Sequence, residues 1–340
     1  MIRMNDVTKI YQSKNRLRLF RSETRLHTAV HALNLSIEPG EVAGLLGLNG
    51  AGKTTTIRML STLLDPTSGT IEVDGLSMNT HRRMIQQKVN MIPGGERMLY
   101  WRLTGRENLE YFGRLYGLSR AAINSESARL LNEVGLADAA DLPVEQYSKG
   151  MKQRLQIARG LINDPAYLFL DEPTLGLDAP IARQLRATVS RLAKEQGKGI
   201  LLTSHYLQEV EELCDRVYIL NRGELLLCGK PEAIISQIAG SQTAHLDVNG
   251  WDEQLRPLLL THLSGLGYPA QLAGTAAVSG QTSAQEDESY RISVQTPAAD
   301  RLITTLLPWA SSHGLRIHSF SCDKPTLEDA IIRLAEDKVS

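Results

Sequence analysis

The length, composition and charge of the chain limit its possible folds and partners. Its 340 residues allow one to three domains, and 42% hydrophobic with 22% charged residues is an ordinary globular balance. A formal net charge of −1 argues against binding nucleic acid through bulk charge. The sequence begins without an apolar signal region, and no run of about 18 apolar residues predicts a membrane span. Three widely spaced cysteines predict reduced thiols rather than disulfides or a metal site.

The first forty residues are predicted to form two strands separated by a basic segment. Residues 2–10 alternate enough for an edge strand that ends at Tyr11, and residues 30–37 predict a second strand. Between them, residues 12–28 contain five lysines or arginines and one glutamate. Such a charge run is usually a solvated loop, and the alternative is a patch that touches anionic lipid or a partner protein.

A glycine-rich segment follows an apolar run, residues 41–46, that predicts a buried strand. The segment consists of Gly47, Leu48, Asn49, Gly50, Ala51, Gly52, Lys53, Thr54 and Thr55. A helical pattern comes next, and a strand, a glycine-rich turn, Lys-Thr and a helix together indicate a P-loop. Its glycines let backbone N–H groups converge on an anion at a helix N-terminus. We therefore expect Lys53 to reach the β- and γ-phosphates of a nucleotide and Thr54 to hold Mg²⁺.

The middle of the chain alternates helical patterns with apolar runs. Residues 104–134 have apolar positions at helical spacing, which predicts a helical insertion. Residues 166–172 form an apolar run that ends in two acids, and residues 199–205 form another that ends in a histidine. Strands that alternate with helices indicate a parallel sheet covered on both faces.

The sequence changes in character after about residue 235. Strand and helix patterns alternate there, which predicts a small α+β unit of ferredoxin-like order. The expected strands are residues 244–248, 290–294 and 315–320, and the expected helices are residues 251–266, 298–313 and 326–334. Residues 274–288 are rich in Gly, Ser, Thr, Ala and Gln and predict a flexible loop.

The two acids after the first apolar run, Asp171 and Glu172, can complete a site that hydrolyses a nucleotide. A carboxylate that ends a buried strand can hold the water shell of Mg²⁺, and its neighbour can polarise a water in line with the γ-phosphate. An Asp-Glu pair after a strand is more often a helix N-cap. Its position after a P-loop and before Pro173 favours the hydrolytic role.

These motifs, in this order, resemble those of the ATP-binding subunits of ABC transporters, and in particular the bacterial drug and antibiotic export type, ABC-2. Residues 47–55 match the Walker A loop, residues 147–151 the signature motif and residues 168–172 Walker B. Residues 176–178 match the D-loop, and His205 matches the switch histidine.

The resemblance implies a fold and a domain organisation. It implies an α/β P-loop NTPase of ABC type at residues 1–235, with a helical subdomain at about residues 96–160. The small α+β unit at residues 236–340 then becomes an accessory or regulatory domain, and residues 324–329 look like the extension of export-type members.

The same resemblance implies the cofactors ATP and Mg²⁺ and a role for each matching residue. The expected catalytic residues are Lys53, Glu172 and His205. Tyr11 stands where the family stacks an aromatic ring on adenine, and Thr54 and Asp171 would hold the metal. Ser148 and Gly150 would close over the ATP that is bound to a second copy of the domain.

The implied function is that of an ATP-hydrolysing motor subunit at the cytoplasmic face of the membrane. Its partners would be a second ATP-binding domain, in a homodimer, and a separate integral-membrane permease, with no nucleic acid. The alternative is a soluble ABC-type ATPase that acts on ribosomes or DNA. One set of motifs and a charge near zero argue against that alternative. A non-hydrolysing regulatory subunit is a third possibility, which the intact catalytic residues disfavour.

The chain departs from the family pattern in two motifs. The signature has Tyr147, Lys149 and Met151 where the family most often has Leu, Gly and Gln, although related exporters show such variants. In the Q-loop, Gly95 falls where the family has its glutamine, and Glu96 follows it.

We expect Glu96 to serve as a metal-side group in place of that glutamine, because a carboxylate in a glycine turn can reach Mg²⁺ or its water. The alternative is that Glu96 pairs with a nearby arginine, Arg97 or Arg102, on a solvated loop.

Overall fold

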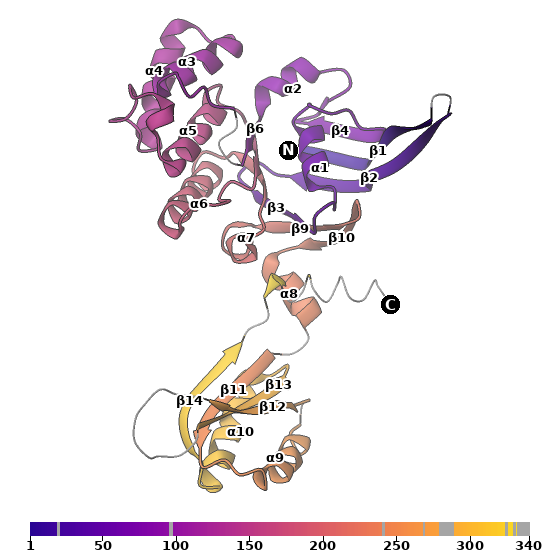
Figure 1. Cartoon of the computed structure of the whole chain (residues 1–340), viewed down its shortest axis with the longest axis vertical. Coiled ribbons are helices and arrows are strands. Elements are labelled where there is room, and N and C mark those ends of the chain that lie inside the picture. The colour runs from indigo at the N-terminus through magenta and orange to yellow at the C-terminus, as the bar shows by residue number, and fades with distance from the viewer. Residues whose placement is uncertain are drawn as a thin grey trace. The chain divides into compact units, whose positions relative to one another are not determined.

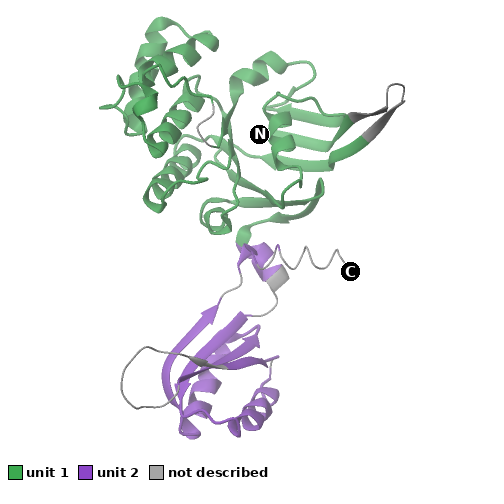
Figure 2. Ribbon diagram, in the orientation of Figure 1, with its two compact units in different colours: residues 1–231 green, residues 232–340 purple. Residues whose placement is uncertain are grey.

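The computed structural model divides the chain into two compact units, unit 1 (residues 1–231) and unit 2 (residues 232–340) (Figure 2). The structure describes residues 1–18, 21–94, 98–239, 242–267, 269–278, 289–323, 326–328 and 331. The border expected between residues 235 and 236 lies inside helix α8 (Pro231–Ala239).

Unit 1 contains two sheets and a group of helices. Its strands are β1 (Ile2–Arg18), β2 (Arg21–Ile37), β3 (Val42–Gly47), β4 (Ser68–Val73), β5 (Leu76–Ser77), β6 (Val89–Pro93), β7 (Tyr167–Asp171), β8 (Gly199–Thr203), β9 (Arg216–Asn221) and β10 (Glu224–Gly229). Its helices are α1 (Lys53–Leu60), α2 (Arg82–Lys88), α3 (Gly105–Leu115), α4 (Arg120–Glu133), α5 (Lys149–Leu161), α6 (Ala179–Lys194) and α7 (Leu207–Leu213), with a 3₁₀ turn, η1 (Val144–Gln146).

The larger sheet of unit 1 brings the predicted motifs to one edge. Within the described residues its order is β10-β9-β3-β8-β7-β6, and the pairs are parallel except for β10 with β9. Strands β3, β7 and β8 are buried along almost their whole length, as expected in a parallel sheet whose two faces are covered. Their carboxyl ends lead into the P-loop, into Glu172 and into His205 respectively.

The second sheet corrects two expectations about the first forty residues. Its order is β2-β1-β4-β5, so β1 lies between two strands and is not the predicted edge strand. The basic segment is not a loop either, because Tyr11 pairs with His27 and Arg16 with Ser22 across an antiparallel ladder. An antiparallel pair can leave a face open to water, so a run of charges does not prevent strand pairing. Residues 19–20 of this segment lie outside the described residues.

A group of three helices, α3, α4 and α5, confirms the predicted helical insertion (Figure 1). Helix α3 begins with a capping box, because the Thr104 hydroxyl accepts from the Glu107 N–H at 3.1 Å and the Glu107 carboxylate accepts from the Thr104 N–H at 2.8 Å. The helices pack through apolar side chains, such as Leu109, Leu130 and Leu155, that are buried. None of the helices in the described ranges is both long and apolar enough to cross a bilayer.

Unit 2 has the expected ferredoxin-like order, with one strand that the sequence did not predict. Its elements are β11 (Gln242–Asn249), α9 (Leu255–Ser264), β12 (Gln271–Val278), β13 (Ser289–Thr296), α10 (Ala299–Ser312) and β14 (Arg316–Asp323). The antiparallel sheet has the order β12-β13-β11-β14. Strand β12 overlaps the start of the predicted loop. The sequence did not predict this strand because its small residues conceal the period of a strand. The rest of that loop, residues 279–288, and most of the expected helix at 326–334 lie outside the described residues.

The sheet of unit 2 has one apolar face and one polar face. Along β11, Leu246 and Val248 are buried in the core, while Asp247 between them points to the other face. There Arg291 donates to both Asp247 oxygens at 2.7 and 3.0 Å, and the Ser319 hydroxyl donates to one of them at 2.7 Å. Hydrogen bonds from Arg291 lower the pKa of Asp247 to about 2. Ion pairs between neighbouring strands therefore stabilise the polar face, which does not need a second apolar layer to cover it.

We expect Leu246→Ala to destabilise unit 2 and to leave nucleotide binding intact. Leu246 is 0% exposed in the core of unit 2, so truncation should cost about 2–5 kcal/mol of its unfolding free energy. Trp251 and Trp309 lie in the same core, so tryptophan fluorescence in urea reports the change. Leu258→Ala on α9 of the same unit, where Leu258 is 50% exposed, is the control. Equal shifts in the two variants would contradict the expectation.

Candidate functional site

The P-loop is a tight turn between β3 and α1, and two of its positions can be occupied only by glycine. Gly52 has φ 101° at the N-cap of α1, and a Cβ atom there would lie 2.5 Å from the Ala29 carbonyl oxygen. A Cβ atom at Gly47 would collide with the Leu220 carbonyl oxygen. The loop is therefore held closely against β2 and β9, with its N–H groups at the start of a helix, where an anion binds favourably.

Lys53 is the cation of this loop. Its ammonium donates to the carbonyl oxygens of Gly47 at 2.6 Å and of Leu48 at 3.3 Å. Burial lowers the pKa of Lys53, and the nearby carboxylates of Glu172 and Asp171 oppose that shift. A partly desolvated ammonium gains more from an arriving phosphate than an exposed one would.

The P-loop borders a pocket of about 240 Å³ that the first β-hairpin also lines. Its lining residues are Tyr11, His27, Ala29, Asn49, Gly50, Ala51, Gly52, Lys53, Thr54, Thr55 and Glu172. The structure thus brings the expected adenine ring partner, Tyr11, to the P-loop, and the Tyr11 hydroxyl lies 3.5 Å from the Thr55 hydroxyl. His27, which pairs with Tyr11 across the ladder, has no predicted role, and only that register places it here.

Side chains at the end of β8 contact the two acids at the end of β7. The Thr203 hydroxyl donates to an Asp171 carboxylate oxygen at 2.7 Å. His205 Nε2 lies 2.7 Å from the carboxylate of Glu172. These contacts follow from the parallel register, in which Asp171 stands opposite Thr203. The predicted acids and the predicted histidine therefore meet at one edge of the sheet.

The backbone of Glu172 has a conformation that most residues avoid. Its φ is 52°, in the left-handed region, where a residue with a side chain is strained. Its N–H donates to Thr203, to the carbonyl oxygen at 3.1 Å and to the hydroxyl at 3.0 Å. The hydrogen bonds to Thr203 therefore hold Glu172 in this strained conformation directly after β7.

Ser148 and Gly150 do not line the P-loop pocket of their own chain. Ser148 is the exposed N-cap of α5, and its hydroxyl accepts from the Met151 N–H at 3.2 Å. Gly150 is buried against Ile181 of α6, whose side chain would have to shift to admit a Cβ atom. Figure 1 shows α5 grouped with α3 and α4, apart from α1.

The segment that replaces the Q-loop begins beside the acids. A Cβ atom at Gly94 would lie 2.6 Å from the Asp171 carbonyl oxygen and 2.7 Å from that of Glu172, so glycine allows the close approach. Gly95 and Glu96, the expected metal-side group, lie outside the described residues.

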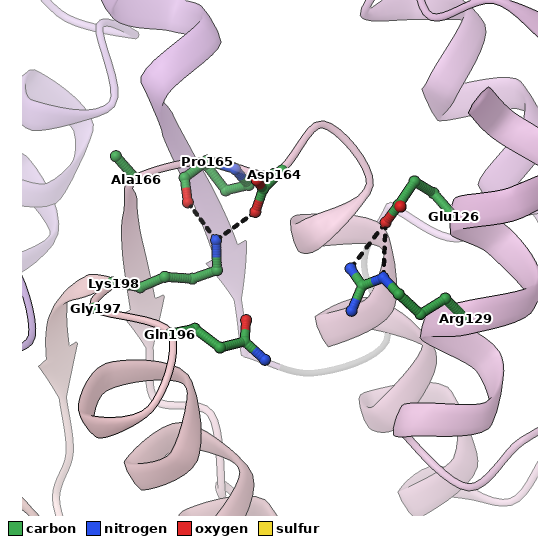
Figure 3. A pocket seen from close by; sticks show the side chains of 8 residues that line it. All are labelled: Glu126, Arg129, Asp164, Pro165, Ala166, Gln196, Gly197 and Lys198. Carbon is green, nitrogen blue, oxygen red and sulfur yellow. Dashed lines mark hydrogen bonds and ion pairs between the residues drawn. The ribbon is translucent and has the colours of Figure 1, made fainter.

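A larger pocket, of about 550 Å³, does not offer comparable chemistry (Figure 3). The Lys198 ammonium in it donates to Asp164 at 2.6 Å and to the Pro165 carbonyl oxygen at 2.8 Å. Arg129 donates to Glu126 at 2.9 Å. Because these cations are already paired with acids, they are poor partners for a phosphate.

The metal expectation fits the oxygen atoms of the P-loop pocket and of β7. Thr54 and Asp171 offer a hydroxyl and a carboxylate, the hard ligands that Mg²⁺ prefers. No cluster of three or more His, Cys, Asp or Glu that could hold a metal occurs in the described ranges.

Comparison with known sequences gives three informative relatives. The family model described as ABC transporter matches residues 30–175. ABC transporter ATP-binding protein NatA of Bacillus subtilis is 43% identical over 64% of this chain and 88% of its own. Linearmycin resistance ATP-binding protein LnrL of the same species is 33% identical over 90% of this chain and 93% of its own. Nod factor export ATP-binding protein I of Ralstonia nicotianae is 36% identical over 90% of this chain and 89% of its own.

A solved structure agrees with these relatives. The dimeric post-hydrolysis state of the ATP-binding cassette MJ0796, bound to ADP and Pi, is 25% identical with a TM-score of 0.59. The match covers 68% of this chain and 98% of that one. The predicted fold class is confirmed.

Thr203 is a site residue that sequence reasoning missed, and we expect Thr203→Val to impair the site. The change keeps the shape but leaves Asp171 and the Glu172 N–H with one hydrogen bond fewer each. Stability should fall by about 1–3 kcal/mol, and the ATP hydrolysis rate should fall roughly 10- to 100-fold.

Thr188→Val on α6 is the matched control, because the Thr188 hydroxyl donates within its own helix, to the Gln184 carbonyl oxygen at 3.1 Å. Denaturation and phosphate release are measured on both variants. A Thr203→Val protein with the control's hydrolysis rate would show that the hydroxyl does not position Asp171.

Proposed function

Because this chain belongs to the ABC transporter family, as an ATP-hydrolysing subunit of the export type, we propose that it drives the export of drugs, antibiotics or other small hydrophobic compounds. The observation that carries the motor role is the P-loop pocket with the Glu172–His205 pair beside it. The substrate class rests on the relatives, because one is named for linearmycin resistance and another for Nod factor export.

In the proposed mechanism, the P-loop N–H groups and Lys53 hold the phosphates of ATP. Thr54 and Asp171 would hold Mg²⁺, which when bound neutralises phosphate charge. Thr203 fixes the Asp171 carboxylate through the 2.7 Å hydrogen bond. Tyr11 at the hairpin offers its ring to the adenine base.

Glu172 and His205 act on the γ-phosphate side of the pocket. Glu172 polarises the attacking water, which can reach its carboxylate because that side chain is 27% exposed. His205 contacts the γ-phosphate and orients Glu172 through the 2.7 Å contact of Nε2 with the carboxylate. Two groups that touch each other and the same reacting centre form a catalytic pair.

We place the second half of the site on another copy of the chain. The signature N-cap, Ser148, is exposed and lies away from the P-loop pocket of its own chain. A head-to-tail homodimer would let Ser148 and Gly150 of each copy close over the ATP of the other. We expect the dimer to sit at the cytoplasmic face of the membrane, with no nucleic acid involved.

An exposed aromatic cluster supports a permease docking surface. Tyr100, Trp101 and Tyr111 are 46%, 50% and 38% exposed. The rings of Tyr100 and Tyr111 lie 4.7 Å apart, and the Lys152 ammonium lies 4.5 Å from the ring of Trp101. Exposed aromatic clusters of this kind mark interaction sites, and they often carry most of the binding energy.

The motor role predicts that Glu172→Gln binds ATP but does not turn it over. Amide for carboxylate keeps the shape of the pocket and removes the group that activates water, so phosphate release should fall at least about 100-fold. Equilibrium ATP binding and phosphate release are measured on the pure protein. Glu195→Gln, on a carboxylate outside the pocket lining, is the control. Phosphate release near the unmodified rate would remove Glu172 from this role.

The docking role predicts that Trp101→Ala weakens permease binding and spares ATP hydrolysis in the isolated chain. An anchoring tryptophan is worth about 2 kcal/mol or more when it is truncated. Leu63→Ala, at another exposed apolar side chain, is the control. The fraction of chain retained on permease-containing membranes is the measurement. Equal retention of the two variants would place the permease elsewhere.

A further inference from the structure

A buried carboxylate next to the site, Glu209 of α7, accepts two hydrogen bonds that the mechanism above does not use. Glu209 is 3% exposed. The hydroxyls of Thr174 and Ser204 both donate to its Oε2 atom, at 2.8 and 2.7 Å. Removing a carboxylate from water is costly, so a carboxylate in this place needs a reason beyond packing.

The two hydroxyls belong to the two loops that carry Glu172 and His205. Thr174 follows Glu172 by two residues, and the Leu175 N–H donates to the Glu172 carbonyl oxygen at 3.2 Å, so the turn is closed. Ser204 directly precedes His205.

The Ser204 hydroxyl links the turn after β8 to Glu209. It accepts from the Tyr206 N–H at 3.0 Å and donates to Glu209 at 2.7 Å, with a longer contact of 3.4 Å to the Tyr206 carbonyl oxygen. The Glu209 N–H in turn donates to the Tyr206 carbonyl oxygen at 3.0 Å. The turn that presents His205 is thus closed through Glu209.

We propose that Glu209 is a positioning residue, which ties the loop of Glu172 to the loop of His205 and sets the distance between these two side chains. It does not touch the reacting atoms. One carboxylate oxygen, shared by a hydroxyl from each loop, fixes both loops to the same point on α7. This inference rests on the proposed roles of Glu172 and His205.

A purely structural role would have a different signature. If Glu209 only stabilised the fold, its loss would lower the amount of folded protein, and the folded fraction would keep its turnover number. If it positions the pair, the folded protein should bind ATP normally and turn it over slowly, because a misplacement of about 1 Å can cost on the order of 100-fold in rate.

The test compares variants of the full chain for melting temperature, ATP affinity, KM and kcat. We expect Glu209→Ala to lower kcat about 10- to 100-fold with ATP affinity unchanged. Glu209→Gln keeps an acceptor oxygen for both hydroxyls, so it should recover most of kcat. Glu212→Gln on the same helix, at an acid that is 51% exposed, is the matched control and should behave as the unmodified chain.

Thr174→Val and Ser204→Ala keep the test valid if Glu209→Ala does not fold. Each removes one of the two donors, and each should lower kcat and leave ATP affinity unchanged. The inference is overturned if folded variants keep the unmodified kcat, or if kcat falls equally in Glu209→Gln and Glu209→Ala. Glu172→Gln is measured in parallel. If Glu172→Gln retains hydrolysis while the Glu209 variants lose it, the proposed function fails. If Glu172→Gln loses hydrolysis while the Glu209 variants retain it, only the role of Glu209 fails.

Discussion

The site depends on the parallel pairing of β7 with β8. That register sets Asp171 opposite Thr203, and the three residues where β8 ends then engage three different acids. Thr203 bonds to Asp171, Ser204 to Glu209 and His205 to the acid after Asp171. Backbone hydrogen bonds of the sheet are rigid and position Asp171 and Thr203, and the loops that carry Ser204, His205 and Glu172 begin directly after these two residues. The P-loop at the end of β3, the other neighbour of β8, completes the same edge.

Much of this arrangement could be predicted from sequence because its signals are local. The glycine-rich turn, the acids after an apolar run and the helical spacing before α4 each occupy one short stretch, and the predicted fold class and family are confirmed. The extension of β1 and β2 through the basic segment and the strand β12 were missed for a related reason. Their pairing depends on partners across the sheet, and polar or small side chains conceal the period of the strand.

Thr203, His27 and Glu209 show the limit of such reasoning. None belongs to a motif that predicts chemistry, and each reaches its partners only through the tertiary fold. Thr203 needs the register with Asp171, and His27 needs the hairpin register with Tyr11. Glu209 needs α7 to pack against two loops. A single sequence does not give these distances. The predicted site therefore contained the groups expected to contact phosphate and metal, and it lacked the neighbouring residues that the fold brings to these groups.

The two-faced sheet of unit 2 also constrains how that unit can fold. If β11 slipped by one residue against β13, Asp247 would turn into the core and Leu246 would turn to water. The core would then contain a carboxylate separated from Arg291, at a cost of several kcal/mol. Misregistered sheets are therefore too unstable to accumulate while the strands search for their partners. The Asp247–Arg291 pair therefore favours the correct strand register during folding, in addition to any small contribution it makes to the stability of the folded unit.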